Sequence, residues 1–308
     1  MVQMRHSRQR IVKQPDRFDY DRYPRVAYEK MVGKAKRIEE AVVRCGISPT
    51  TNSRITKYRK CIEEFTTKAM AGELPAHFDW ILFHQALCEI SQLKTIVEAL
   101  LHVPISHEWT SRLAELVSGH VLPQSEAEQS RARDLQFELN VAAHCRAAGY
   151  VVEPKEPDVL VRSSKEAFGI AVKRPKSPKT LERHIRKASK QIQRSGMDGL
   201  VAIDLSLIHN PENKILLAQK SEDGINAVRR AADGFVEMNK SRIRSLVKIP
   251  DVFGLVAHMS SLCFNPSTLD FSTATRWTIM NLCEMTDVRD DRLRKFSTRF
   301  AIGVGQTN

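Results

Sequence analysis

The sequence of this 308-residue chain predicts an α/β protein in which a helical N-terminal part precedes a mixed α/β part. Three observations support this fold class. Apolar residues recur at three- and four-residue steps from about residue 24 to residue 119, as on the buried stripe of amphipathic helices. After residue 124, short apolar segments alternate with helical patterns. One of these segments, residues 200–203, is apolar without interruption, as expected for a buried central strand.

At the level of sequence the chain divides into a basic N-terminal arm (1–23), a helical domain (24–123) and an α/β domain (124–308). The arm is polar and basic, which is typical of a poorly ordered tail. Gly46, Gly72 and Pro104 are suited to ending helices. The helical domain is therefore expected to contain helices at residues 25–45, 53–71, 81–101 and 107–118.

In the α/β domain a helix is expected over residues 126–148, ended by Gly149. Ser177 followed by Pro178 predicts the start of a second helix, which reaches about Gly196. Strands are expected at 150–154, 158–162, 168–174, 200–203, 252–263 and 273–283, and further helices at 222–247 and 287–300.

Charge and cysteine content narrow the function classes. The formal net charge of +12 fits a polyanionic partner, of which nucleic acid is the commonest. The six cysteines show no CxxC zinc pair, so they are interpreted as reduced core thiols of a cytoplasmic protein. The N-terminus lacks the apolar region of a secretory signal, and no apolar run reaches the about 18 residues that a membrane helix needs.

The most informative segment joins two short apolar strands through a polar turn, which predicts a β-hairpin at residues 157–174. Asp158 begins the first strand and Lys173 ends the second. Because side chains alternate along a strand, Lys173 and Ala171 share one face and Val172 points to the other. An acid and an ammonium on one face of a small sheet can hold a divalent metal and an attacking water beside a phosphate.

This arrangement resembles the PD-(D/E)xK nuclease superfamily over about residues 126–206. The residues that carry the resemblance follow the family order: Phe137-Glu138-Leu139, Ala147, Gly149-Tyr150, Pro157-Asp158 and Val172-Lys173-Arg174. The resemblance implies a restriction-endonuclease-like αβββαβ core with an extra helix and strands, and a Mg²⁺- or Mn²⁺-dependent endonuclease. It further implies that Asp158 and Glu138 hold the metal. Lys173 would position or deprotonate the attacking water, or stabilise charge on the scissile phosphate.

One departure from the family pattern is Ala171, which stands two residues before Lys173, where the family has Asp or Glu. A methyl group cannot ligate a metal, so three outcomes stay open. A different acid has moved into the site, with Glu138, Glu153 and Glu156 as candidates. Alternatively, Asp158, Glu138, the Val172 carbonyl and waters hold the metal. In the third outcome the site is inactive and the fold serves binding.

Two further residues belong to the candidate site. Glu138 lies on an otherwise apolar stripe with Leu135, Ala142 and Cys145, where a carboxylate needs a partner. A metal or Lys173 would supply that partner, and a stripe-edge Glu that reaches solvent is the alternative. Gln191 borders the buried stripe of the helix after the hairpin. In some branches of the resembling superfamily a Gln on this helix touches the site or the substrate backbone.

The same helix carries a dense basic face, and repulsion between these like charges would be relieved by a phosphate backbone. The candidate nucleic-acid-binding residues are Arg174, Lys176, Arg183, Arg186, Lys187, Lys190 and Arg194. A solvated basic face is the alternative.

The leading hypothesis from sequence is a metal-dependent nuclease acting on DNA, with RNA as the alternative substrate and defence, restriction or repair as the implied settings. The main rival is a degenerate nuclease-like protein that binds nucleic acid without cutting it. A third hypothesis makes the helical domain a protein-interaction scaffold. The sequence leaves self-association open.

Overall fold

The computed structural model describes residues 25–73, 78–100, 106–119, 130–212, 214–247, 251–267, 270–282 and 288–304. The expected basic arm and the expected domain boundary at residues 123–124 lie outside these residues. The helical part contains α1 (Arg25–Arg44), α2 (Arg54–Ala71), α3 (Trp80–Leu100) and α4 (His107–Ser118). Gly72 ends α2 in the left-handed conformation, as its position in the sequence predicts.

The α/β part begins with α5 (Ser130–Ala147), β1 (Val151–Glu153), β2 (Val159–Arg162), β3 (Ala167–Lys173), α6 (Pro178–Ser195) and β4 (Gly199–Asp204). It continues with α7 (Ser206–His209), β5 (Leu216–Leu217), α8 (Ser221–Leu246), β6 (Val252–Asn265), β7 (Asp270–Asn281) and α9 (Val288–Gly303). The predicted α/β class and the helical N-terminal part are confirmed. α7 and β5 were not predicted, because elements this short leave no periodic signal.

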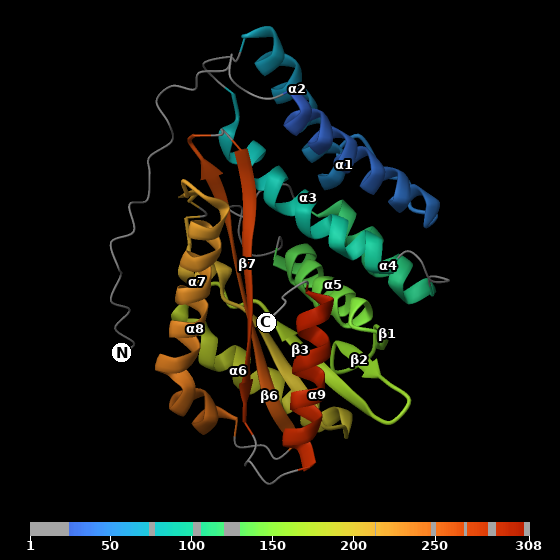
Figure 1. The fold of residues 1–308 in the computed structure, drawn as a ribbon. Coiled ribbons are helices and arrows are strands. Elements are labelled where there is room, and N and C mark those ends of the chain that lie inside the picture. The colour runs from blue at the N-terminus through green and yellow to red at the C-terminus, as the bar shows by residue number, and fades with distance from the viewer. Residues whose placement is uncertain are drawn as a thin grey trace.

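The strands form one mixed sheet. Strands β1, β2 and β3 pair antiparallel, β3, β4 and β6 pair parallel, and β7 pairs antiparallel with β6. Helices α5 and α9 cover one face of this sheet, and α6 and α8 cover the other (Figure 1). The carboxyl ends of β3 and β4 therefore lie at the same edge, between the α5 layer and the α6 layer.

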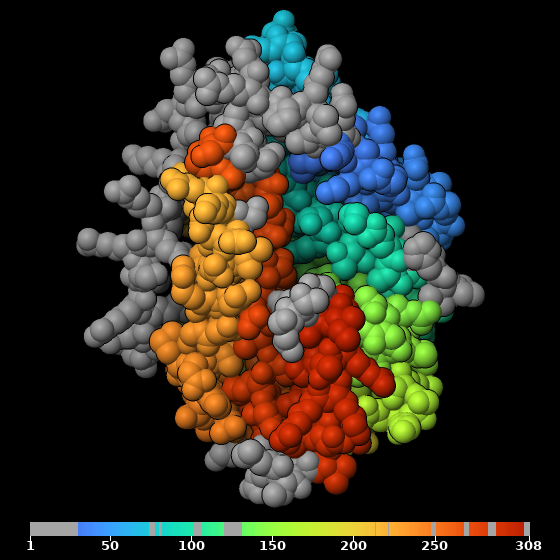
Figure 2. Space-filling model, in the orientation of Figure 1, coloured from blue at the N-terminus to red at the C-terminus, as the bar shows by residue number. Residues whose placement is uncertain are grey.

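The helical part shares its core with the α/β part. One cluster of buried apolar residues runs from Ile38 of α1 and Phe83 of α3 through Leu139 of α5 to Val159 of β2. In the space-filling view the helical segments, coloured blue to cyan, lie directly against the α/β part (Figure 2). Contacts between α3 and α5 carry much of this junction, so the helical part can influence residues at the sheet edge.

Five cysteines fall in the described residues, and all of them are free thiols. Among the helices that the structure describes, none combines the length and the apolar character that crossing a membrane would need.

Candidate functional site

The hairpin brings Asp158 and Lys173 together. Val159 lies opposite Ile170 in the β2–β3 pairing, so the next position along each strand sets Asp158 beside Ala171. Gly169 makes this approach feasible, because a side chain there would lie only 2.4 Å from Cδ of Pro157. Lys173 Nζ then donates a hydrogen bond of 2.8 Å to Asp158 Oδ2.

Asp158 is held by nitrogen donors on both of its carboxylate oxygens. Oδ2 also accepts a hydrogen bond from the backbone N–H of Val172 at 2.7 Å, and Oδ1 accepts one from Nε2 of Gln191 at 2.8 Å. The Asp158 side chain is 19% exposed. Burial raises the pKa of this carboxyl, and the charge and hydrogen bond of Lys173 oppose that rise.

The ammonium of Lys173 is also held by hydrogen bonds. Besides Asp158, its ammonium donates to the carbonyl oxygen of Val172 at 2.8 Å, and its side chain is 14% exposed. Gln191 reaches the same carboxylate from α6. Asp158 from the turn before β2, Lys173 from β3 and Gln191 from α6 thus converge at the carboxyl end of β3. Asp158, Lys173 and Gln191, all predicted from sequence as site residues, are thus placed together.

Glu138 lies at the rim of this group and is engaged by an arginine. It forms an ion pair with Arg112 of α4, whose guanidinium also donates a hydrogen bond of 3.4 Å to the backbone carbonyl of Asp158. Arg112 thus joins both acids of the expected metal site to the helical part. Sequence reasoning missed Arg112, since nothing in the local pattern of α4 reports a partner 46 positions away.

A second missed acid is Asp134, one helical turn before Glu138 on α5. Burial raises its pKa to about 6, although the positive charges of Arg174, Lys176 and Lys173 act to lower it. By its accessible surface, however, Asp134 is exposed to solvent, so the effect of burial is reduced. Its four-residue spacing from Glu138 was the available signal.

The other acids considered from sequence do not reach this group. Glu153 lies on β1 and forms an ion pair with Arg162 at 3.4 Å. Glu156 is exposed in the loop before β2. Ala171 is fully buried and belongs to the apolar cluster that contains Leu181 and Ile185 of α6, so no carboxylate occupies its position.

These residues fit a resident Mg²⁺ or Mn²⁺ poorly. Such ions need several oxygen ligands, but both oxygens of Asp158 already accept N–H donors, and Glu138 is bound by Arg112. In the part of the chain that the structure describes, no group of three or more His, Cys, Asp or Glu side chains is placed to hold a metal ion. In this geometry the ammonium of Lys173 binds Asp158 and the guanidinium of Arg112 binds Glu138, so these two acids do not form a preorganised metal centre.

The basic face of α6 lies next to this group and is open to solvent. Its basic side chains are exposed, and none of them has an ion-pair partner within the described residues: Arg183, Arg186, Lys187, Lys190 and Arg194. The acid of the same helix, Glu182, is bound by Arg242 of α8. Lys176, just before α6, is exposed as well.

Arg174 is placed differently from the other predicted basic residues. It follows Lys173 but points to the α5 side of the sheet, where its Nε donates a hydrogen bond of 2.9 Å to Asp204 Oδ2. Asp204 ends β4, and an acid at the carboxyl end of a buried strand was a signal that the sequence contained. Arg174 is thus set apart from the α6 face.

Comparisons with known proteins add no further constraint: no family model, curated protein or solved structure matches this chain.

Proposed function

We propose that this chain is a nucleic-acid-binding protein built on a restriction-endonuclease-like core, and that it binds a phosphate backbone along α6. The single observation that carries the proposal is the exposed basic face of α6, whose cations lack ion-pair partners in the described residues. Unpaired cations in a row repel one another, and a polyanion relieves that repulsion.

The order of elements supports the core assignment. α5, β1, β2, β3, α6 and β4 follow one another in the αβββαβ order that the family resemblance implies. The Asp158–Lys173 pair lies at the carboxyl end of β3, and Asp158 contacts α6 through Gln191, near the end of that helix. A backbone lying on α6 would therefore pass the candidate site.

The dimensions of α6 suit a duplex. Residues 183–194 span about 17 Å at 1.5 Å per residue. Double-stranded DNA presents about one negative charge per 1.7 Å of its axis, so several phosphates lie within reach of this face. DNA is the favoured partner, with RNA as an outcome of the test.

The test is a salt titration of duplex binding, followed by fluorescence anisotropy. If about five cations contact phosphates, log K against log salt should fall with a slope of about −4 to −5. A matched RNA duplex is titrated in parallel. Binding that is absent at low salt, or that does not change with salt, would remove the proposal.

A second candidate function is metal-dependent phosphodiester hydrolysis. The convergence of Asp158, Lys173 and Gln191 favours it, but a metal would have to displace N–H donors that now bind Asp158. The test is plasmid nicking in Mg²⁺ and in Mn²⁺ by the wild type, Lys173→Ala and Asp158→Ala. Nicking that both substitutions abolish would make the chain a nuclease. Salt-sensitive binding without nicking would leave the binding function alone.

A further inference from the structure

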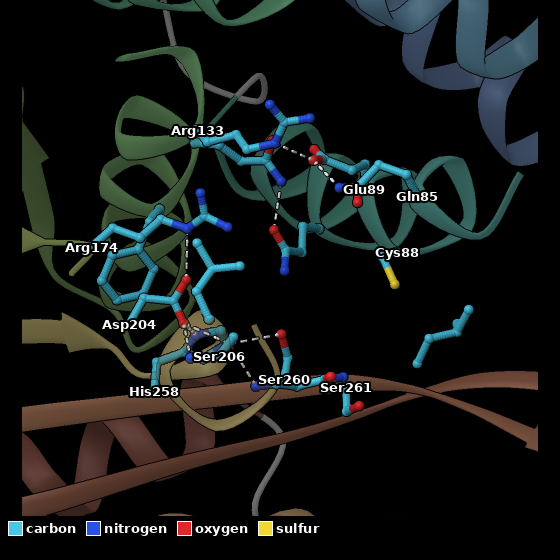
Figure 3. Close-up of a pocket in the computed structure, with 16 residues that line it drawn as sticks. Gln85, Cys88, Glu89, Arg133, Arg174, Asp204, Ser206, His258, Ser260 and Ser261 are labelled. Carbon is cyan, nitrogen blue, oxygen red and sulfur yellow. Dashed lines mark hydrogen bonds and ion pairs between the residues drawn. The ribbon is translucent and has the colours of Figure 1, made fainter. Parts of the chain in front are cut away.

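A polar cavity of about 60 Å³ lies on the opposite side of the sheet edge from α6. Its walls come from α3, α5, the carboxyl end of β4 and the middle of β6, represented by Glu89, Arg133, Asp204 and His258 (Figure 3). All four of these side chains are at most 7% exposed. Buried charges of this density are costly unless each one is bonded, so their partners decide what the cavity can accept.

The two carboxylates of the cavity are fully engaged. Asp204 Oδ1 accepts hydrogen bonds from the backbone N–H and the hydroxyl of Ser206 and contacts Nδ1 of His258 at 3.0 Å. Burial acts to raise the pKa of Asp204, but His258, Arg174 and Ser206 together hold it well below its usual range. Glu89 is bound by Arg54, Arg133 and Gln85.

The arginines of the cavity are not equally engaged. Arg174 uses Nε for Asp204, while its two terminal amino groups have no hydrogen-bond partner among the described residues. Figure 3 shows its guanidinium on the same side of the cavity as that of Arg133. Burial lowers the pKa of Arg133, and the charge of Arg174 lowers it further, so these two cations oppose each other.

We propose that this cavity binds a small oxyanion, a phosphate group, through the terminal amino groups of Arg174. A guanidinium fork matches two phosphate oxygens, and an anion between Arg174 and Arg133 relieves their repulsion. One water needs about 10–15 Å³ of cavity volume. The cavity of about 60 Å³ therefore has room for about four to six waters, or for one tetrahedral ion in their place. The Ser260 side of the cavity supplies further polar groups.

The phosphate has two chemical sources: the free ion or the terminal phosphate of a polynucleotide strand. Lys173 and Arg174 are consecutive at the end of β3, so their side chains point to opposite sides of the sheet. Lys173 lies on the side of Asp158, and Arg174 lies on the side of the cavity. A strand terminus in the cavity would therefore lie close to the Asp158–Lys173 pair. The cavity itself is argued from its own contacts and does not depend on duplex binding by α6.

The experiment measures inorganic phosphate binding to the full chain by phosphorus NMR line broadening and by the shift in Tm, against chloride at equal ionic strength. The wild type should show both effects. Arg174→Lys keeps a cation near Asp204 but loses the fork, so we expect binding at least about tenfold weaker. Lys34→Gln, on the exposed surface of α1, should leave phosphate binding unchanged.

Arg174→Gln should weaken phosphate binding more than Arg174→Lys does, because it removes the cation as well. Circular dichroism confirms that this variant is folded. A wild type that responds equally to phosphate and chloride would overturn the proposal, as would an Arg174→Lys variant with wild-type affinity. Neither result depends on duplex binding by α6, whose failure would appear only in the salt titration.

Oligonucleotides with and without a 5′-phosphate distinguish the two sources. If the site takes a strand end, the phosphorylated form should bind about tenfold more tightly to the wild type and no more tightly to Arg174→Lys. Equal binding of the two oligonucleotides, together with binding of inorganic phosphate, would assign the cavity to the free ion.

Discussion

Two groups of charged side chains in this protein are arranged in opposite ways. On α6, basic residues such as Arg186 and Lys190 reach solvent without ion-pair partners in the described residues. Between α2, α3 and α5, Arg54, Glu89 and Arg133 are buried and bonded to one another. The net charge of +12 cannot distinguish these groups. Pairing shows which cations stabilise the fold and which remain available to a partner.

The largest effect is expected from breaking the buried group. Glu89→Gln removes the carboxylate that binds both Arg54 and Arg133, which are 1% and 4% exposed. Two buried cations then lose their counter-charge, so the free energy of unfolding should fall by about 3–5 kcal/mol in urea denaturation. Glu98→Gln is the matched control, because Glu98 is 58% exposed and pairs with Lys94. The control should cost at most about 0.5 kcal/mol. Equal costs for the two variants would contradict the comparison.

Next in size is the loss of the open group. Changing Arg186, Lys187 and Lys190 to Gln should reduce the salt slope of duplex binding by about 2.7 and weaken binding about a hundredfold near physiological salt. The free energy of unfolding should change little, because these side chains are exposed.

The control for this variant removes the same charge from α1, by changing the exposed Lys30, Lys34 and Arg37 to Gln. If the α1 variant weakened binding as much as the α6 variant, the net charge rather than the α6 face would be responsible.

The difference between the two groups also explains how far the sequence could predict this protein. The hairpin contact of Asp158 with Lys173 followed from strand alternation and a short turn, both of which are local. The stops at Gly72 and Gly196 followed from the left-handed conformation that glycine adopts readily. These predictions needed only neighbouring residues.

Contacts between distant segments could not be predicted in this way. Arg112 contacts Glu138 because α4 packs on α5. Arg133 contacts Glu89 because α3 packs on α5. Arg174 was grouped with the α6 cations because it lies beside them in sequence. Because side chains alternate along β3, Lys173 and Arg174 lie on opposite sides of the sheet. On its side, Arg174 contacts Asp204, which belongs to β4 and is distant in sequence.

A smaller effect is expected at Arg112, which stands between the two groups in burial. Arg112→Ala removes a partly buried ion pair with Glu138 and a weak hydrogen bond to the Asp158 carbonyl, so unfolding should become easier by about 1–2 kcal/mol. Arg131→Ala is the control, because Arg131 is 81% exposed and pairs with Glu115. It should cost under about 0.5 kcal/mol. If the two variants were equally stable in urea, Arg112 would not join α4 to the site.

The smallest effect concerns Asp134, an acid that lies among the cations at the sheet edge. Its pKa is raised by burial to about 6, from an unfolded value of about 3.9. Between these values the folded chain binds more protons than the unfolded chain, so this group lowers stability as pH rises from about 4 to 6. Asp134→Asn lacks this dependence. Because the side chain reaches solvent, the difference between the two proteins should stay under about 1 kcal/mol.

Urea denaturation across this pH range measures the stability difference, and carboxyl carbon NMR measures the pKa of Asp134 directly. Arg174→Gln should raise that pKa further, because Arg174 is the foremost of the positive charges that lower it. A pKa at or below about 4 would show that water solvates Asp134 fully. Asp134 would then belong with the open charges rather than between the two groups.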